Sequence, residues 1–97
     1  MRPTVGRIVH YQVNQSMVDK LRKEAEERGD RGEETWIDIP EVGQDLPMIV
    51  ISVRSDDIVN GRIFADGQAL FDLWGNDVHK GAVPGTWHWP EISAENE

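Results

Sequence analysis

Residues 48–67, MIVISVRSDDIVNGRIFADG, determine the fold that we expect for this chain. Two runs rich in β-branched and aromatic residues, 48–54 and 58–65, flank a short polar stretch, which is the pattern of two paired strands. Asp66 and Gly67 then indicate a second tight turn, because glycine adopts the positive φ that such turns require. The stretch therefore predicts two antiparallel strands and a hairpin leading into a third.

Three more strands are predicted outside this stretch. Residues 7–13, RIVHYQV, alternate with period two, and 69–74, ALFDLW, and 86–90, TWHWP, are short and rich in apolar and aromatic side chains. Residues 75–85 contain three glycines and one proline and are expected to form a loop. Five short strands around one core predict a mainly β (α+β) fold, either a small bent antiparallel sheet or a partly open barrel.

One helix is expected over about residues 17–28, inserted between the first and second strands. Ser16 suits its N-cap, with Asp19 in the capping-box position, and Gly29 suits its C-terminal cap. A narrow apolar stripe with helical spacing is formed by Val18, Leu21 and Ala25. We expect this helix to be largely exposed.

Length and composition indicate one small domain over residues 1–91, with a mobile acidic loop at about 29–46 and a flexible tail at 92–97. The chain of 97 residues has no cysteine, which excludes disulfides and thiolate metal ligands. No apolar run is long enough to span a bilayer, and no signal-peptide pattern begins the chain. We expect a soluble intracellular protein.

The net charge of −8 limits the possible partners. Affinity for nucleic acid depends mainly on neutralising phosphates, so direct nucleic-acid binding is not expected. The acidic surface either serves solubility alone or mimics DNA toward a basic partner.

Strand parity assigns one set of side chains to the core. In the second strand Ile49, Ile51 and Val53 share a face, and the expected core residues are Ile49, Ile51, Phe71, Leu73, Trp87 and Trp89. Large buried aromatics would fill a small barrel. The alternative is that Trp87 and Trp89 form a stacking platform for a ring-shaped ligand.

The opposite face carries the candidate ligand-binding residues, which are Arg54, Asn60, Arg62, Trp74 and His88. Two guanidiniums, an amide, an indole and an imidazole suit a compound with a phosphate and a ring. The alternative is a solvated face whose arginines pair with Asp57 or Asp72.

Recognisable catalytic motifs are absent from the sequence. It contains no G-x-S-x-G, H-E-x-x-H, Walker-type glycine loop or G-x-G-x-x-G. His10, His79 and His88 are far apart in sequence, and we expect them to be structural rather than zinc ligands. We predict no catalytic residues, no metal, no cofactor and no enzymatic activity.

Four segments carry a resemblance to a known family. PTVGRIVHY (3–11), PMIVISV (47–53), VNGRIFADG (59–67) and PGTWHWP (84–90) resemble, in order and spacing, a family of small, largely uncharacterised bacteriophage proteins common in phages of actinobacteria. Many members carry a D-G-N-D turn where this chain has DGQAL. The resemblance implies a phage setting but no mechanism.

These observations together predict a phage-encoded, non-enzymatic binding protein in the host cytoplasm. In its sharpest form it antagonises host defence by sequestering a small nucleotide-type signal. One alternative is an acidic protein-binding inhibitor or DNA mimic that uses residues 24–45, and a second is a structural or assembly protein of the virion. We expect a homo-oligomer that associates through the helix and the outer face of the sheet, without membrane contact.

Overall fold

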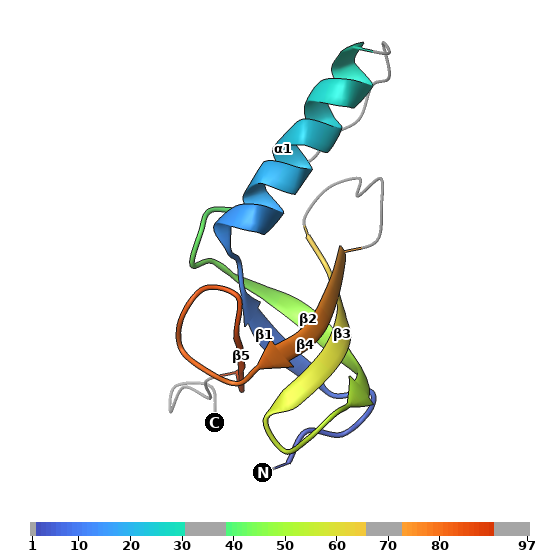
Figure 1. Ribbon diagram of the computed structural model, residues 1–97, viewed down its shortest axis with the longest axis vertical. Helices are drawn as coiled ribbons and strands as arrows, with labels where there is room; N and C mark the ends of the chain where they lie inside the picture. The colour runs from blue at the N-terminus through green and yellow to red at the C-terminus, as the bar shows by residue number, and fades with distance from the viewer. Residues whose placement is uncertain (1, 31–38, 66–72, 91–97) are drawn as a thin grey trace, which may run out of the picture.

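The computed structural model describes residues 2–30, 39–65 and 73–90. Five antiparallel strands form one curled sheet in the order β4-β3-β2-β1-β5, and one helix lies between β1 and β2 (Figure 1). The elements are β1 Ile8–Gln12, α1 Gln15–Asp30, β2 Asp45–Val53, β3 Ile58–Ile63, β4 Leu73–His79 and β5 Trp87–His88. The predicted mainly β half-barrel with one inserted helix is therefore confirmed.

The core is formed by the concave face of the sheet together with the base of α1. Its buried side chains are Val9, Tyr11, Val13, Met17, Val18, Leu21, Leu46, Met48, Val50, Val59, Ile63, Leu73, Val78 and Trp87. Burial also raises the pKa of the Tyr11 phenol above its ordinary value of 10.0. Trp87 is fully buried, so its predicted place in the core is confirmed.

The curl brings the end of β4 close to β5. Lys80 forms an isolated bridge with Trp87, and the Gly81 N–H donates to the Trp87 carbonyl at 2.9 Å. The carbonyl of Asp57, in the β2–β3 turn, accepts hydrogen bonds from the Lys80 N–H at 2.8 Å and from Trp87 Nε1 at 2.9 Å. Trp87 thus links β5 to the segment that follows β4 and to the β2–β3 turn.

The predicted face of the second strand is wrong. Met48 and Val50 are fully buried, whereas Ile51 is 47% and Val53 38% exposed, and Ile49 is only partly buried. The run MIVI is apolar at every position, so its sequence contains no period-two signal. The Met48 side chain fits in the interior because Gly61, on the neighbouring strand β3, has no side chain. A Cβ on Gly61 would lie 2.7 Å from Met48 Cγ.

The fourth strand extends further than predicted. β4 runs from Leu73 to His79 and includes residues 75–79, which the sequence predicts to be loop. Its register against β3 shifts between Val59 and Gly61, and Asp77 has a φ of 49°, so the polar residues there do not alternate regularly. The predicted turn at Asp66–Gly67 and the predicted core residue Phe71 lie outside the described residues.

The helix begins two residues earlier than predicted and has a different cap. The side chain of Asn14, not Ser16, accepts the N–H of Met17 at 2.9 Å, and Asp19 accepts a hydrogen bond from the Gln15 amide at 2.8 Å. The Val13 N–H donates to the Gln44 carbonyl at 2.9 Å, so the chain leaves the sheet at Asn14.

The far end of the helix also differs from the prediction, since Gly29 lies within α1 and does not end it. Met17, Val18 and Leu21 are buried at its base and Ala25 is partly buried, while the rest of the helix extends away from the sheet (Figure 1). The described residues include no helix that is both long and apolar enough to cross a membrane. Residues 31–38 of the predicted acidic loop and the predicted tail (92–97) lie outside the described residues, whereas residues 29–30 and 45–46 of that loop belong to α1 and β2.

Candidate functional site

A row of side chains crosses the convex outer face of four neighbouring strands. Ile8 on β1 lies opposite Ile49 on β2, Ile49 lies opposite Arg62 on β3, and Arg62 lies opposite Trp74 on β4. Ile8 is 55% and Trp74 44% exposed. Directly opposite residues in antiparallel strands are close enough for their side chains to interact. An aliphatic pair, a guanidinium and an indole therefore form one continuous strip.

Phe64 widens this strip. It follows Arg62 by two residues, so it lies on the same face, and its N–H donates to the Pro47 carbonyl at 3.0 Å. Phe64 is 44% exposed. We call Ile8, Ile49, Arg62, Phe64 and Trp74 the outer-face patch. Exposed apolar groups of this kind, gathered in one place, are typical of a binding surface.

Of the five predicted ligand-binding residues, the structure places Arg62 and Trp74 directly opposite each other, whereas Arg54 and Asn60 both contact Asp77. Asn60 Oδ1 accepts the Asp77 N–H at 2.7 Å, and Arg54 Nε lies 3.6 Å from Asp77 Oδ1. Arg54 and Asn60 therefore support the irregular part of β4. The predicted alternative, an arginine paired with an aspartate, applies to Arg54, which pairs with Asp77; Asp72 lies outside the described residues.

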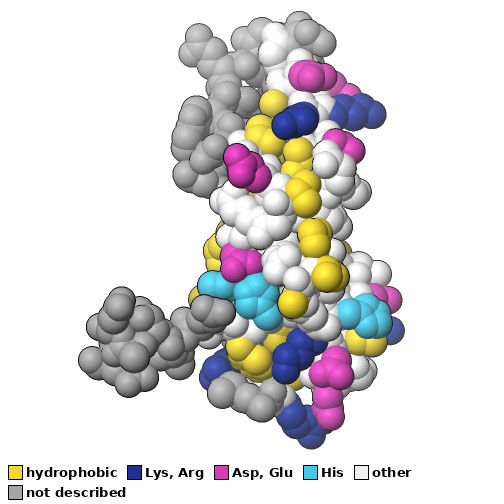
Figure 2. All heavy atoms as spheres, turned by 90° about the vertical axis from the view of Figure 1, so that its left-hand side faces the viewer, with side chains coloured by type: hydrophobic (Ala, Val, Ile, Leu, Met, Phe, Trp, Pro, Cys, Tyr) yellow, Lys and Arg dark blue, Asp and Glu magenta, His cyan; other side chains and the backbone are white. Residues whose placement is uncertain are grey.

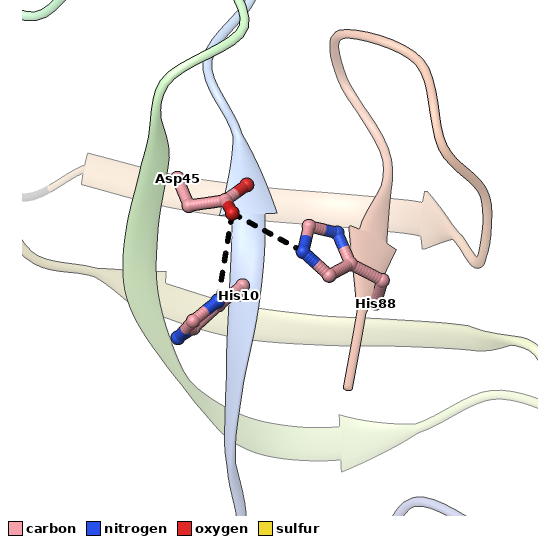
Figure 3. A group of neighbouring side chains, drawn as sticks. All are labelled: His10, Asp45 and His88. Atoms are coloured by element: carbon pink, nitrogen blue, oxygen red, sulfur yellow. Dashed lines mark ion pairs between the residues drawn. The ribbon is translucent and has the colours of Figure 1, made fainter. Parts of the chain in front are cut away.

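His88, the fifth predicted residue, lies on β5 at the other end of the strand order, where it forms a cluster with two residues that the sequence prediction did not include. Its Nε2 lies 3.3 Å from Asp45 Oδ2, and His10 Nδ1 lies 3.6 Å from the same oxygen (Figure 3). The two imidazole rings meet edge to face, with 5.5 Å between their centroids. We call His10, Asp45 and His88 the histidine–aspartate cluster.

Strand register holds these three side chains together. His10 on β1 lies opposite His88 on β5 and opposite Pro47 on β2, and Asp45 precedes Pro47 by two residues on the same face. Asp45 therefore lies diagonally across from His10. The intervening residues on the other face are buried, so a register slip would expose the core.

An open depression of about 440 Å³ adjoins the cluster. It is lined by Gln12, Gly43, Asp45, Gly81, Ala82, His88 and Trp89. Figure 2 shows histidine side chains at the surface directly beside an acidic side chain, below the helix. The cluster is therefore accessible to a ligand or an ion.

Trp89 lies at the boundary between the core and the surface. It is only partly buried, packs on the core and meets Trp87 edge to face at 5.3 Å, with the Arg7 guanidinium 5.5 Å from its ring. It also lines the depression, and its buried Nε1 has no hydrogen-bond partner among the described residues. Trp87 belongs to the core alone, whereas Trp89 forms part of the surface.

The sequence contains a weak signal for one of the missed residues. His10 occupies an outward position in the predicted first strand, on the opposite parity from Val9 and Tyr11. Asp45 falls in a predicted loop, and nothing in the sequence pairs His10 with His88.

Searches against protein-family models, curated proteins and solved structures found no match to this chain.

Proposed function

We propose that this chain is a non-enzymatic binding protein that uses its outer-face patch to capture a small nucleotide-type ligand. The resemblance to bacteriophage proteins implies a phage setting. There the protein would act in the host cytoplasm and antagonise host defence by sequestering a nucleotide-type signal. The observation that carries this proposal is the exposed indole of Trp74 directly opposite Arg62.

The chemistry of this pair suits a nucleotide. An exposed indole offers a flat surface for a base, and stacking of a base on an aromatic side chain is worth about 1–3 kcal/mol. A guanidinium binds phosphate through two parallel charge-assisted hydrogen bonds. Phe64 and Ile49 would add apolar contact around the stacked ring. None of these roles requires a catalytic group.

Titration calorimetry against cyclic nucleotides and ADP-ribose derivatives tests this proposal. We expect binding by the wild type and a loss of about 1–3 kcal/mol in affinity in Trp74→Ala, because the stacking surface is removed. Arg62→Gln should also weaken binding of phosphorylated compounds, whereas Arg2→Gln, which changes a highly exposed arginine outside the patch, should bind as the wild type does. Absence of heat with every compound, in a folded sample, would contradict the nucleotide proposal.

The alternative of an acidic inhibitor or DNA mimic receives less support. It depends on residues 24–45, of which 31–38 lie outside the described residues. In α1 the acidic side chains of this region, Glu24, Glu26 and Glu27, directly follow three basic ones, Lys20, Arg22 and Lys23, whose positive charges offset theirs. A phosphate backbone is negative throughout, so this part of the helix imitates it poorly.

We also propose that the outer-face patch supports self-association. A second copy would pack on Ile8 and Phe64 and leave Trp74 beside a pocket between the two chains, and two-fold pairing is the commonest solution for identical chains. It would also bring two copies of Arg62 near each other, which would raise the local positive potential for an anionic ligand.

Light scattering at low and moderate salt tests the self-association. We expect a dimer that tightens as salt rises, because each chain carries a net charge of −8 and salt screens the repulsion. Ile8→Asp should dissociate it, whereas Val83→Asp, at a residue that is 60% exposed and outside the patch, should not. A monomer mass of 11.0 kDa under both conditions would remove the dimer from the proposal.

A further inference from the structure

The histidine–aspartate cluster has the composition of a metal site. Two imidazoles and one carboxylate each offer one ligand atom, and these three atoms lie within 4.8 Å of one another. Imidazole nitrogen suits zinc, copper, iron and nickel, and a carboxylate oxygen is accepted by most of these ions. The donors come from β1, β2 and β5, so they converge through the fold and not through a local sequence motif.

The separations of the two imidazole nitrogens from the carboxylate oxygen leave room for an ion between the three side chains. Ligand bonds to zinc of about 2.0–2.2 Å place neighbouring ligand atoms roughly 3.3 Å apart in a tetrahedral site. The two separations from Asp45 Oδ2 are 3.3 Å to His88 Nε2 and 3.6 Å to His10 Nδ1. The longer separation, from His10, exceeds the usual length of a hydrogen bond, so His10 faces the Asp45 carboxylate without a direct hydrogen bond to it.

The surroundings favour a cation and hold the donors in place. The backbones of all three residues belong to paired strands, whose opposite faces are fixed by buried core residues. Donors on strands are held more precisely than donors on loops. The side chains are partly exposed, at 36% for His10, 42% for Asp45 and 27% for His88, so an ion can enter from solvent. The net charge of −8 attracts cations to the surface.

We propose that His10, Asp45 and His88 bind one divalent transition-metal ion, with zinc as the best fit to two nitrogen donors and one oxygen donor. His10 binds through Nδ1 and His88 through Nε2, since these are the atoms that face Asp45 (Figure 3). Three protein ligands leave a coordination position for water or a ligand, as in other open zinc sites.

The ion would also tie an edge strand to the sheet. β5 has only two residues, and both of them pair with β1. A metal that joins His88 to Asp45 reaches over β1 and links three strands at once. This inference does not depend on nucleotide binding by the outer-face patch, which is centred on β3 and β4.

Titration calorimetry of zinc chloride into tag-free, EDTA-treated protein tests the site. We expect one zinc ion per chain, and affinity reduced about tenfold or more in Asp45→Asn and in His88→Ala. His79→Ala is the matched control, because His79 is an exposed histidine on β4 outside the cluster, and it should bind as the wild type does. Asp45→Asn keeps the size of the side chain, so circular dichroism in EDTA should show an unchanged fold.

A second measurement identifies the ligand atoms. Long-range ¹H–¹⁵N NMR of the imidazoles should show zinc shifting Nδ1 of His10 and Nε2 of His88, with no shift for His79. Thermal unfolding should move to higher temperature with zinc in the wild type, less so in Asp45→Asn, and return with EDTA. Zinc binding that survives both Asp45→Asn and His88→Ala, that is lost equally in His79→Ala, or that gives one ion per two chains would overturn the proposal.

Discussion

Replacement of Trp87 by alanine is expected to lower the free energy of unfolding by about 3–5 kcal/mol. The side chain is fully buried, stacks edge to face with Trp89 and donates to the carbonyl of Asp57. The variant loses the packing of the largest buried side chain of the described core. Because a small domain is stable by only about 5–15 kcal/mol, this loss removes a large share of the total.

Urea unfolding of Trp87→Ala and Trp74→Ala provides the matched comparison. Trp74 is 44% exposed, so its removal should cost no more than about 1 kcal/mol. Trp87→Phe should be intermediate, since it keeps an aromatic ring but lacks the N–H; the Asp57 carbonyl still accepts from the Lys80 N–H. The double variant of Trp87 and Trp89 to alanine should not fold. Equal losses in Trp87→Ala and Trp74→Ala would show that position 87 is not core.

The strand content and the inserted helix can be predicted because each has a local signal. β1 alternates regularly between buried Val9 and Tyr11 and outward His10, and on β3 the outward Arg62 follows buried Gly61. Period-two alternation arises from the pleat itself, so it does not depend on any distant contact. The sequence therefore separates the two faces of these strands correctly.

The errors occur where the deciding contact is distant in sequence. In β2 the run MIVI is apolar throughout, and the burial of Met48 depends on a glycine in the next strand. In β4 the extension through Asn76 and Asp77 depends on the Asn60 side chain, 17 residues away, which accepts the Asp77 N–H. Neither partner can be recognised from the strand's own residues.

Of the two candidate sites, one follows from local sequence signals and the other depends on contacts between residues far apart in the chain. Arg62 and Trp74 are predicted to share a face, and pairing of β3 with β4 places them directly opposite each other. The cluster of His10, Asp45 and His88 depends on β5, near the end of the described chain, returning to pair with β1 near its start. Sequence spacing cannot predict such a closure.

Replacement of Gly61 by alanine is expected to be the second strongly destabilising change. A Cβ there would lie 2.6 Å from the Ile49 carbonyl oxygen and 2.7 Å from Met48 Cγ, both far inside van der Waals contact. The carbonyl belongs to the neighbouring strand β2 and cannot move without disturbing the β2–β3 pairing. We expect a loss of about 1–3 kcal/mol, as is usual for overpacked cores, and a larger loss for valine.

Gly29→Ala is the matched control for this substitution. Gly29 lies in α1, its φ is not positive, and nothing lies within 4 Å of the position that an added methyl group would occupy. Alanine should therefore be neutral there or stabilise the protein by up to about 1 kcal/mol. The two changes add the same methyl group, and their opposite signs would isolate the contact with β2.

A double-mutant cycle with Met48→Ala then separates the two contacts of Gly61. Removing the Met48 side chain relieves the clash at Cγ but leaves the clash with the Ile49 carbonyl, so we expect only partial rescue, with a coupling energy of about 0.5–3 kcal/mol. Complete rescue would place the whole cost on the Met48 side chain. If Gly61→Ala instead unfolds at the same urea concentration as the wild type, Met48 is not held against β3, and the inward face that the structure assigns to β2 is wrong.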